Sequence, residues 1–382
     1  MQFSFTEEQE EFRGILRRFL EDKSPTTEVR RLMETDEGYD PDVWRQICQD
    51  LGLTAVHIPE AYGGQGFGFV ELGIVVEEMG RALLCAPYFA STVLAATAIL
   101  NAGSEEQKQT LLPDIASGAT IATLAFTEDN GRGGMDGVEL TATVADGGYK
   151  LDGHKSFVLD GHTAGLIVVL ARRPGTSGSD GLSLFAVQGD ADGLDRTLLQ
   201  TLDPTRKQAR LTFSGVAAQL IGDEGSAAAP MAKTLDQATA CLANEMVGGA
   251  ERLRESALEY SQLRVQFGRA IGSFQALKHR SADMLLDVEM AKSAAYYATA
   301  AVDDDAENLQ PAVSLAKAAA ADAYMQAAIT TVQMHGGIGF TWDNDTHLWF
   351  KRAKSSEVFL GTANEHRERL IENWDAMERS VA

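Results

Sequence analysis

The hydrophobic pattern of this chain changes twice, and the two changes divide it into three parts. Residues 1–117 repeat apolar side chains at helical spacing, as in Phe12, Leu16 and Phe19. Residues 118–226 show short β-branched segments separated by Gly, Asp or Asn, such as V-E-L-T-A-T-V at 138–144. Residues 227–382 return to long helical stretches, of which the alanine-rich 312–333 is the strongest. The sequence therefore predicts a helical domain, a small antiparallel β-domain (a barrel or sandwich) and a second helical domain.

Local signals predict where individual elements begin and end. Thr6, followed by several glutamates, is a plausible capped start for the first helix. Gly52 ends a later helical pattern, and the run P-E-A-Y-G-G-Q-G-F-G at 59–68 predicts a glycine-rich loop. These signals support the helical assignment of the amino-terminal part.

Size and charge exclude several functions. A chain of 382 residues suits two or three domains rather than one core. Its net charge of −22 argues against binding to nucleic acid or to an anionic membrane surface. The acidic amino terminus is unlike a signal peptide, and no apolar run approaches the roughly 18 residues that a membrane helix needs. The three scattered cysteines predict buried thiols in a reducing, cytoplasmic setting, and the seven histidines show no metal-ligand spacing.

Two segments in the last part carry the chemistry. The first, Y-S-Q-L-R-V-Q-F-G-R-A-I-G-S-F-Q at 260–275, places an arginine, an amide and an aromatic ring within four positions. The second, Q-M-H-G-G-I-G-F at 333–340, ends a helix in a glycine pair and is expected to leave backbone N–H groups bare. A fixed cation, a ring face and open backbone donors are what a phosphate-bearing aromatic cofactor requires.

These two segments resemble the flavin-binding segments of the acyl-CoA dehydrogenase family, and other blocks extend the resemblance over essentially the whole chain. The supporting blocks are P-E-A-Y-G-G-Q-G at 59–66, E-E-M-G-R at 77–81, L-L-P-D-I-A-S-G at 111–118, A-F-T-E at 125–128, D-G-H-K-S-F at 152–157 and L-G-T-A-N-E-H at 360–366. The resemblance implies an α+β fold with an amino-terminal helical domain (1–117), a middle β-domain (118–226) and a carboxy-terminal four-helix bundle (227–382). It also implies a tetramer that holds FAD.

The resemblance further implies which residues contact FAD. Arg264 would neutralise the pyrophosphate, Phe267 would pack on the adenosine side, and Gln275 would form a hydrogen bond. These groups would reach the flavin of a neighbouring subunit, where Gln333, Gly336 and Gly337 would join them. Alternatives stay open, because Arg264 can be a surface cation at a helix end and Gly336–Gly337 a plain helix cap. The implied cofactor contacts are Phe126, Thr127, Phe157, Leu159, Arg264, Gln266, Phe267, Ile271, Phe274, Gln275, Gln333, Gly336, Gly337, Thr362 and Asn364.

Two segments depart from the family pattern around the flavin. The family's T-E-P-G-A-G-S-D is T-E-D-N-G-R-G-G here (127–134), so that Gly133 and Gly134 replace a serine and an aspartate. In the segment that corresponds to W-I-T-N, Leu159 replaces a threonine expected to hydrogen-bond the flavin. Thr127 is retained.

The two positions of the catalytic base also depart from the family pattern. Family members place a glutamate either before the G-T of the last block or early on the long helix; here those positions are Leu360 and Ala238. Glu245 lies seven residues after Ala238, on the same helix face but roughly 10 Å along it. Its apolar neighbours predict burial, which suits a general base. The alternative is a structural ion pair with an arginine or a place in the acyl tunnel, and Asp343 is a further candidate for which a solvated or capping role is expected.

Three functions follow as hypotheses. The first is a FAD-dependent acyl-CoA dehydrogenase of lipid metabolism or β-oxidation, which converts a CoA thioester to its trans-2-enoyl form and passes electrons to an electron-transfer flavoprotein. The second is a non-catalytic or half-site subunit that contributes to a partner's flavin site in a heterotetramer. The third is a related flavin oxidase or monooxygenase, which nothing in the sequence specifically favours.

Overall fold

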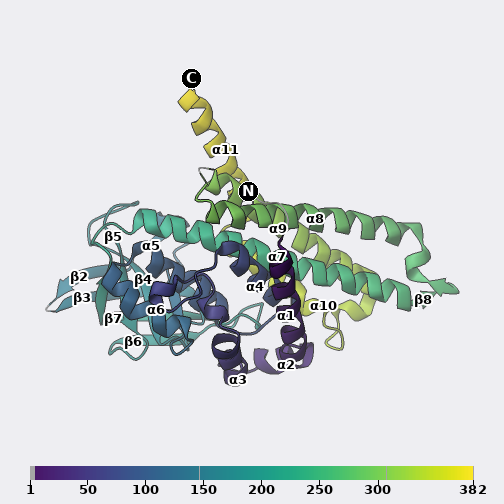
Figure 1. Cartoon of the computed structure of the whole chain (residues 1–382), viewed down its shortest axis with the longest axis horizontal. Helices are drawn as coiled ribbons and strands as arrows, with labels where there is room; N and C mark the ends of the chain where they lie inside the picture. The colour runs from purple at the N-terminus through teal and green to yellow at the C-terminus, as the bar shows by residue number, and fades with distance from the viewer. Residues whose placement is uncertain (1–4, 146, 307, 382) are drawn as a thin grey trace. The chain divides into compact units, whose positions relative to one another are not determined.

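The computed structural model describes residues 5–145, 147–306 and 308–381. In this part of the chain helices come first, a sheet follows from Ala122 to Ile221, and long helices return (Figure 1). The predicted order of helical, β and helical parts is confirmed.

The chain folds into two compact units that draw on distant segments. The first unit combines the described residues up to Arg30 with Gly68–Leu84 and the residues from Thr239 onward. The second combines Arg31–Phe67 with Cys85–Ala238. The amino-terminal helices are thus shared between the two units, and the three sequence domains stay a prediction.

The helices before the sheet begin and end largely where the sequence indicates. Thr6 Oγ1 accepts the N–H of Gln9 at 3.2 Å, and Gln9 Oε1 accepts the N–H of Thr6 at 2.9 Å, so that the predicted cap is a capping box. Gly52, with a φ of 66°, follows the predicted helical stretch and turns the chain. The elements are α1 (Glu7–Lys23), α2 (Thr26–Met33), α3 (Pro41–Arg45), η1 (Gln46–Asp50), η2 (Leu53–Ala55), η3 (Glu60–Tyr62), α4 (Phe69–Arg81), η4 (Phe89–Ala96), α5 (Thr97–Ala102) and α6 (Glu105–Ala116).

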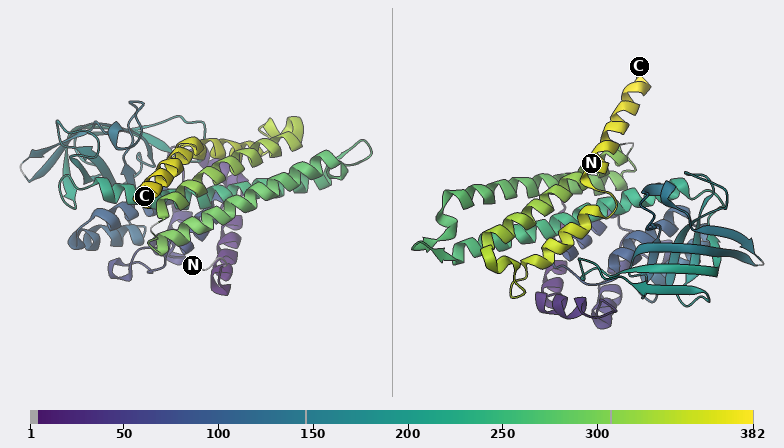
Figure 2. Two further views of the ribbon diagram at one scale, coloured as in Figure 1. Left: turned by 90° about the horizontal axis from the view of Figure 1, so that it is seen from above. Right: turned by 180° about the vertical axis from the view of Figure 1, so that it is seen from behind.

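The sheet of the second unit closes on itself, as the predicted small barrel requires. Its hydrogen-bonded order is β1-β4-β2-β3-β7-β5, β5 also pairs with β4, and β6 pairs with β7. The inward side chains form an apolar core that includes Leu151, Phe185 and Leu211. The strands, visible together in Figure 2, are β1 (Ala122–Ala125), β2 (Thr141–Ala145), β3 (Gly148–Leu159), β4 (Leu166–Arg172), β5 (Leu182–Gln188), β6 (Leu194–Leu198) and β7 (Gln208–Ile221), with a helical turn η5 (Gly134–Gly137) after β1.

The prediction of an antiparallel β-domain is wrong at two pairings of β4. β1 pairs with β4 in parallel, with Ala122 opposite Leu166 and Ala125 opposite Val169. A parallel pair needs a long connection, and here η5 and the β2–β3 hairpin supply it. β2 also meets β4 in parallel, at the single residue pair Thr141 and Arg172. Periodicity within a strand does not reveal the direction of its neighbour.

The long carboxy-terminal helices pack around α9, in agreement with the predicted bundle. α9 contacts α8, α10 and α11, and Figures 1 and 2 show α8 and α9 running side by side in opposite directions. The described helices include none with the length and apolar character that a membrane crossing needs. The elements are α7 (Ala228–Leu263), β8 (Val265–Gln266), β9 (Arg269–Ala270), η6 (Ile271–Ser273), α8 (Gln275–Asp303), α9 (Leu309–His335), η7 (Gly336–Phe340), α10 (Thr346–Val358) and α11 (Ala363–Val381).

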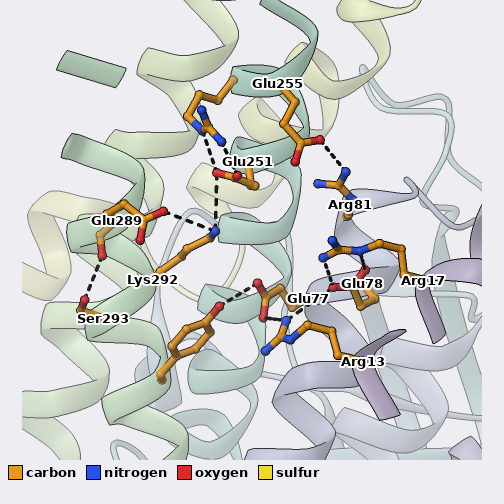
Figure 3. A network of polar contacts seen from close by, with 12 residues as sticks. Arg13, Arg17, Glu77, Glu78, Arg81, Glu251, Glu255, Glu289, Lys292 and Ser293 are labelled. Carbon is orange, nitrogen blue, oxygen red and sulfur yellow. Dashed lines mark hydrogen bonds and ion pairs between the residues drawn. The ribbon is translucent and has the colours of Figure 1, made fainter. Parts of the chain in front are cut away.

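A buried ion pair and a partly exposed one join α1 and α4 in the first unit (Figure 3). Arg13 Nη1 donates to Glu77 Oε2 at 2.5 Å, and Arg17 Nη2 donates to Glu78 Oε1 at 2.7 Å. The Tyr296 hydroxyl of α8 donates to Glu77 Oε1 at 2.8 Å. Burial raises the pKa of Glu77, while the Arg13 guanidinium opposes this shift. These contacts join α1, α4 and α8.

Two glycines let α4 and α7 approach each other at backbone distance. A Cβ on Gly248 would lie 1.9 Å from the carbonyl oxygen of Glu77, and a Cβ on Gly80 would lie 2.1 Å from that of Glu245. Side chains at either position would force the helices apart. The contact at Gly80 therefore holds the backbone of Glu245, on α7, directly against α4.

Candidate active site

The 260–275 segment forms a hairpin between α7 and α8. Its two turn residues, Phe267 and Gly268, have φ values of 52° and 76°, as a two-residue type I′ turn requires. A phenylalanine at positive φ is strained, and the Phe267 ring is 91% exposed. The chain thus holds an aromatic ring away from its own core at a conformational cost, which is typical of a recognition element.

The predicted cation lies at the base of this hairpin. The backbone of Arg264 closes the hairpin, because its N–H donates to Tyr260 O at 2.9 Å and its carbonyl accepts the N–H of Ile271 at 2.8 Å. The Arg264 side chain is exposed, as are those of Gln266 and Gln275. The predicted arginine and both amides are therefore accessible on one short segment.

A second aromatic ring supports the hairpin tip. Phe274 meets Phe267 edge to face, with ring centroids 6.1 Å apart. The guanidinium carbon of Arg269 lies 4.0 Å from the centroid of Phe274. These contacts restrict Phe267 without burying it.

The structure brings the two predicted cofactor segments together in the first unit. Tyr260, four residues before Arg264, stacks on His335 at the end of α9 with ring centroids 4.2 Å apart and planes 19° apart. His335 is held in turn by a 2.8 Å hydrogen bond between Nδ1 and Thr331 O. Because α8 and α9 are antiparallel neighbours, the hairpin and the Q-M-H-G-G segment lie at the same end of the bundle.

The glycine pair of that segment has open space beside it. Gly336 has a φ of 67°, and a Cβ built on Gly336 or Gly337 meets no atom of this chain within 4 Å. The expectation of bare N–H groups is wrong for Gly336, whose N–H donates to the carbonyls of Val332 and Gln333 as a helix cap does. Gln333 itself is exposed. The pair caps α9 and also leaves room for a ligand close to the backbone.

In the second unit, the two predicted residues that follow β1, Phe126 and Thr127, lie beside β3. Thr127 Oγ1 donates to Ser156 O at 2.6 Å, and the N–H of Ser156 donates to Thr127 O at 3.0 Å. Phe126 is half-buried. The Thr127 hydroxyl proton is therefore engaged within the chain.

The next two predicted residues of β3 lie in opposite surroundings. The β3–β7 register is irregular between Lys155 and Val158, and there Phe157 takes a φ of 60° with its ring 52% exposed. Leu159 is buried, and its carbonyl accepts the hydroxyl of Thr123 at 2.6 Å. The structure presents Phe157 outward and Leu159 inward.

The last predicted residues, Thr362 and Asn364, lie at the start of α11. Thr362 Oγ1 donates to Glu365 Oε2 at 2.9 Å and accepts the N–H of Glu365 at 3.3 Å. Asn364 is exposed and accepts a hydrogen bond from Arg367 at 3.2 Å. Thr362 therefore has a structural role as a helix cap, whatever else it contacts.

The candidate base Glu245 forms a buried ion pair. Arg352 Nη1 of α10 donates to Glu245 Oε1 at 3.1 Å, and the two side chains are only 4% and 8% exposed, respectively. This is the arrangement of the structural alternative, while a catalytic role for Glu245 stays a prediction. Ala238 is fully buried, Leu360 is half-buried with a φ of 58°, and Asp343 is exposed.

Several buried ionisable residues escape a search for motifs. Arg352 pairs with Glu245, and Lys155 lies within the quoted block D-G-H-K-S-F without being singled out. Lys317 Nζ donates to Gly361 O at 2.8 Å, and His366 Nε2 lies 2.9 Å from Leu360 O, so both hold the loop before α11. Among these residues, only Lys317 carries a sequence signal, because it is a lysine inside an alanine-rich stretch.

The cysteines and the possible metal ligands of the described residues also bear on chemistry. All three cysteines lie in the described part of the chain, where each is buried and none forms a disulfide. Among the described residues, no group of three or more His, Cys, Asp and Glu side chains is placed to hold a metal ion.

Comparison with protein-family models matches nearly the whole chain. The amino-terminal, middle and carboxy-terminal domains of acyl-CoA dehydrogenase match residues 6–119, 123–216 and 223–374, respectively. The chain belongs to the acyl-CoA dehydrogenase family. The members of this family are oxidoreductases that act on CH–CH groups, which confirms the predicted enzyme class.

Individual proteins are similar to this chain over nearly their full lengths. Acyl-CoA dehydrogenase IpdE2 of Mycolicibacterium smegmatis is 32% identical over 365 residues, which cover 96% of this chain and 98% of that protein. Butyryl-CoA dehydrogenase of Megasphaera elsdenii superposes with a TM-score of 0.90 at 26% identity, covering 98% of this chain and 100% of that one. A chain of the ChsE4–ChsE5 complex of Mycobacterium tuberculosis superposes with a TM-score of 0.88 at 29% identity, covering 98% and 99%.

Proposed function

We propose that this chain takes part in the FAD-dependent α,β-dehydrogenation of a CoA thioester to its trans-2-enoyl form. One observation carries the proposal. The Tyr260–His335 stack unites the hairpin and the glycine pair, so that an exposed arginine, an exposed ring and accessible backbone lie at one end of the bundle. A nucleotide cofactor needs these three kinds of group together.

The residues present fit the nucleotide part of FAD. An empty space beside Gly336 and Gly337 permits close approach to the backbone, which a side chain would block. Arg264 would pair with the pyrophosphate, and Phe267 would pack against the adenosine side. Because Phe267 projects from its own chain, we propose that it serves the flavin of a neighbouring subunit in a tetramer.

The reaction needs two acceptors, one for a proton and one for a hydride. FAD, when bound, supplies the acceptor for the hydride from Cβ. The chain must supply or recruit a carboxylate for the Cα proton, together with donors that polarise the thioester carbonyl. Glu245 is the proposed carboxylate, although its ion pair with Arg352 must open or exchange before it can act.

The missing acids favour a second function, that of a half-site subunit. Neither Ala238 nor Leu360 carries a carboxylate, and Glu245 is already paired. In that case the chain would lend Arg264 and Phe267 to the flavin of a related catalytic chain. The ChsE4–ChsE5 complex, which contains a chain of similar fold, supports this possibility. In either case an electron-transfer flavoprotein is the proposed acceptor.

Flavin content and flavin bleaching distinguish the two functions. The chain would be purified alone and also co-expressed with a related chain that has a glutamate at the position of Leu360. A yellow tetramer of this chain alone, bleached anaerobically by an acyl-CoA, supports the dehydrogenase. A colourless chain that gains flavin only with the partner supports the half-site subunit. A colourless protein in both preparations would contradict both functions.

A further inference from the structure

Lys155 of β3 and Glu128, which follows β1, form an ion pair that is buried on both sides. Lys155 Nζ lies 2.7 Å from Glu128 Oε1, and the two side chains are 0% and 1% exposed. Lys155 also donates to Phe126 O at 3.4 Å. We call this pair, with the backbone groups that it binds, the Lys155–Glu128 node.

The glutamate gathers a third segment. Glu128 accepts the N–H of Glu139 at 2.9 Å and the N–H of Leu140 at 3.0 Å, in addition to the lysine. One carboxylate therefore joins the end of β1, the chain that leads into β2, and β3. Several donors from different parts of the sequence therefore hold the Glu128 carboxylate in one position.

The segments joined by the node are those that carry the predicted flavin contacts of this unit. Phe126 and Thr127 precede Glu128 directly, and the register irregularity that exposes Phe157 begins at Lys155. The sheet ladder is interrupted there, so ladder hydrogen bonds alone do not fix Phe157. The node and the Thr127–Ser156 hydrogen bonds supply the missing constraint.

Stability alone does not explain such a pair. Removing two charges from water costs about as much as their attraction returns, and apolar residues of similar volume are often as stable. A buried pair that joins three segments is better explained by its effect on their backbones, which it holds in a fixed arrangement. Such support behind ligand-binding residues is how proteins hold a site in its productive shape.

We propose that Lys155 and Glu128 are positioning residues that hold Phe126, Thr127 and Phe157 in the arrangement that accepts the flavin ring system. This inference rests on the proposed function, because it needs FAD at these segments. Neither residue contacts the cofactor in the proposal. Both act through the backbone of the residues that do.

The charge of the lysine gives the proposal a pH signature. Burial lowers the pKa of Lys155 to about 8, although Glu128 opposes this shift, and Arg172 adds to it. The partner of Lys155 across the sheet, on β7, is the apolar Leu211. As the pH rises through about 8, Lys155 loses its charge and Glu128 loses its counter-ion, so FAD affinity is expected to fall over that range.

The test uses a charge-free double variant, Lys155→Met with Glu128→Leu, because a single change would leave one buried charge unpaired and can prevent folding. Arg45→Gln with Asp50→Asn is the control, since it removes an exposed 3.5 Å ion pair in the same unit. FAD affinity, the visible circular dichroism of bound flavin, and the unfolding of flavin-free protein would be measured in the assembly that binds flavin.

The double variant is expected to remain folded, as shown by a cooperative unfolding transition. It should bind FAD about tenfold more weakly, because one positioning contact is lost, and its bound flavin should show an altered circular dichroism spectrum. Its affinity should no longer fall above pH 8, whereas the control should behave as the original chain. Wild-type-like affinity, dichroism and pH profile in the double variant would overturn the inference while leaving the proposed function intact. A chain that binds no FAD in any assembly would overturn both.

Discussion

The substitution Glu245→Gln separates a catalytic carboxylate from a structural one. Glutamine has nearly the same volume as glutamate but removes the negative charge opposite Arg352, in a pair whose side chains are at most 8% exposed. Breaking such a pair from one side costs about 3–5 kcal/mol, because a buried charge loses its counter-ion. Since the amide oxygen can still accept a hydrogen bond, the lower end, about 3 kcal/mol, is expected.

Urea unfolding of the flavin-free protein, followed by circular dichroism, measures this loss. The apolar double variant Glu245→Leu with Arg352→Met should recover most of it. The control Lys354→Gln with Glu357→Gln removes a partly exposed pair on the same helix, α10, and should cost less than about 1 kcal/mol.

Anaerobic addition of an acyl-CoA then tests the chemistry in the same variants. If Glu245 is structural, flavin bleaching per folded, flavin-loaded subunit should be unchanged in Glu245→Gln. An unaltered free energy of unfolding combined with a complete loss of bleaching would refute the reasoning from the ion pair. It would identify Glu245 as the base despite its partner.

Three other substitutions test separate parts of the structure. Gly248→Ala places a methyl group 1.9 Å from Glu77 O, so urea unfolding should show a loss of about 1–3 kcal/mol. The methyl group of Gly337→Ala meets no atom within 4 Å, so this variant should keep the stability of the original chain but bind FAD more weakly. Phe267→Ser should leave the unfolding midpoint nearly unchanged and reduce flavin retention on gel filtration; full retention would contradict a role for the ring. Leu360→Glu should increase acyl-CoA bleaching, and no increase would argue against a base at that position.

The sequence predicted the fold well because the decisive signals are local. Helical spacing, alanine content and capping residues act within a few positions, and the 312–333 prediction lies inside α9 (Leu309–His335). The two segments predicted to bind the cofactor could be proposed from the sequence because the cation, ring and glycines lie within two short stretches, and their role as cofactor contacts stays a prediction. The stack that joins them, Tyr260 on His335, was not, since its two rings are separated by an entire helical hairpin.

Two features that the sequence does not reveal, the partner of Glu245 and the direction of the strand beside β1, share one physical cause: the partner of a group lies far away in the sequence. Arg352, which pairs with Glu245, is 107 residues from it, and β4, the parallel partner of β1, follows the β2–β3 hairpin. A strand pattern shows which face is buried but not which strand lies beside it. A buried glutamate likewise predicts a partner but not its identity.

Backbone strain is the other property that the sequence does not show, and here it gives independent support for the site. Six described non-glycine residues have positive φ, and four of them are bulky, namely Leu83, Phe157, Phe267 and Leu360. Leu83 follows α4, outside the predicted site, whereas the other three lie in segments that the sequence predicts to contact the flavin or to carry the catalytic base. Because such strain persists only where surrounding contacts enforce it, its placement indicates that the fold holds these three segments in defined shapes. At Leu360 the shape is retained by Lys317 and His366 although the side chain has no carboxylate, which is the pattern expected of a subunit that kept the family's loop without its base.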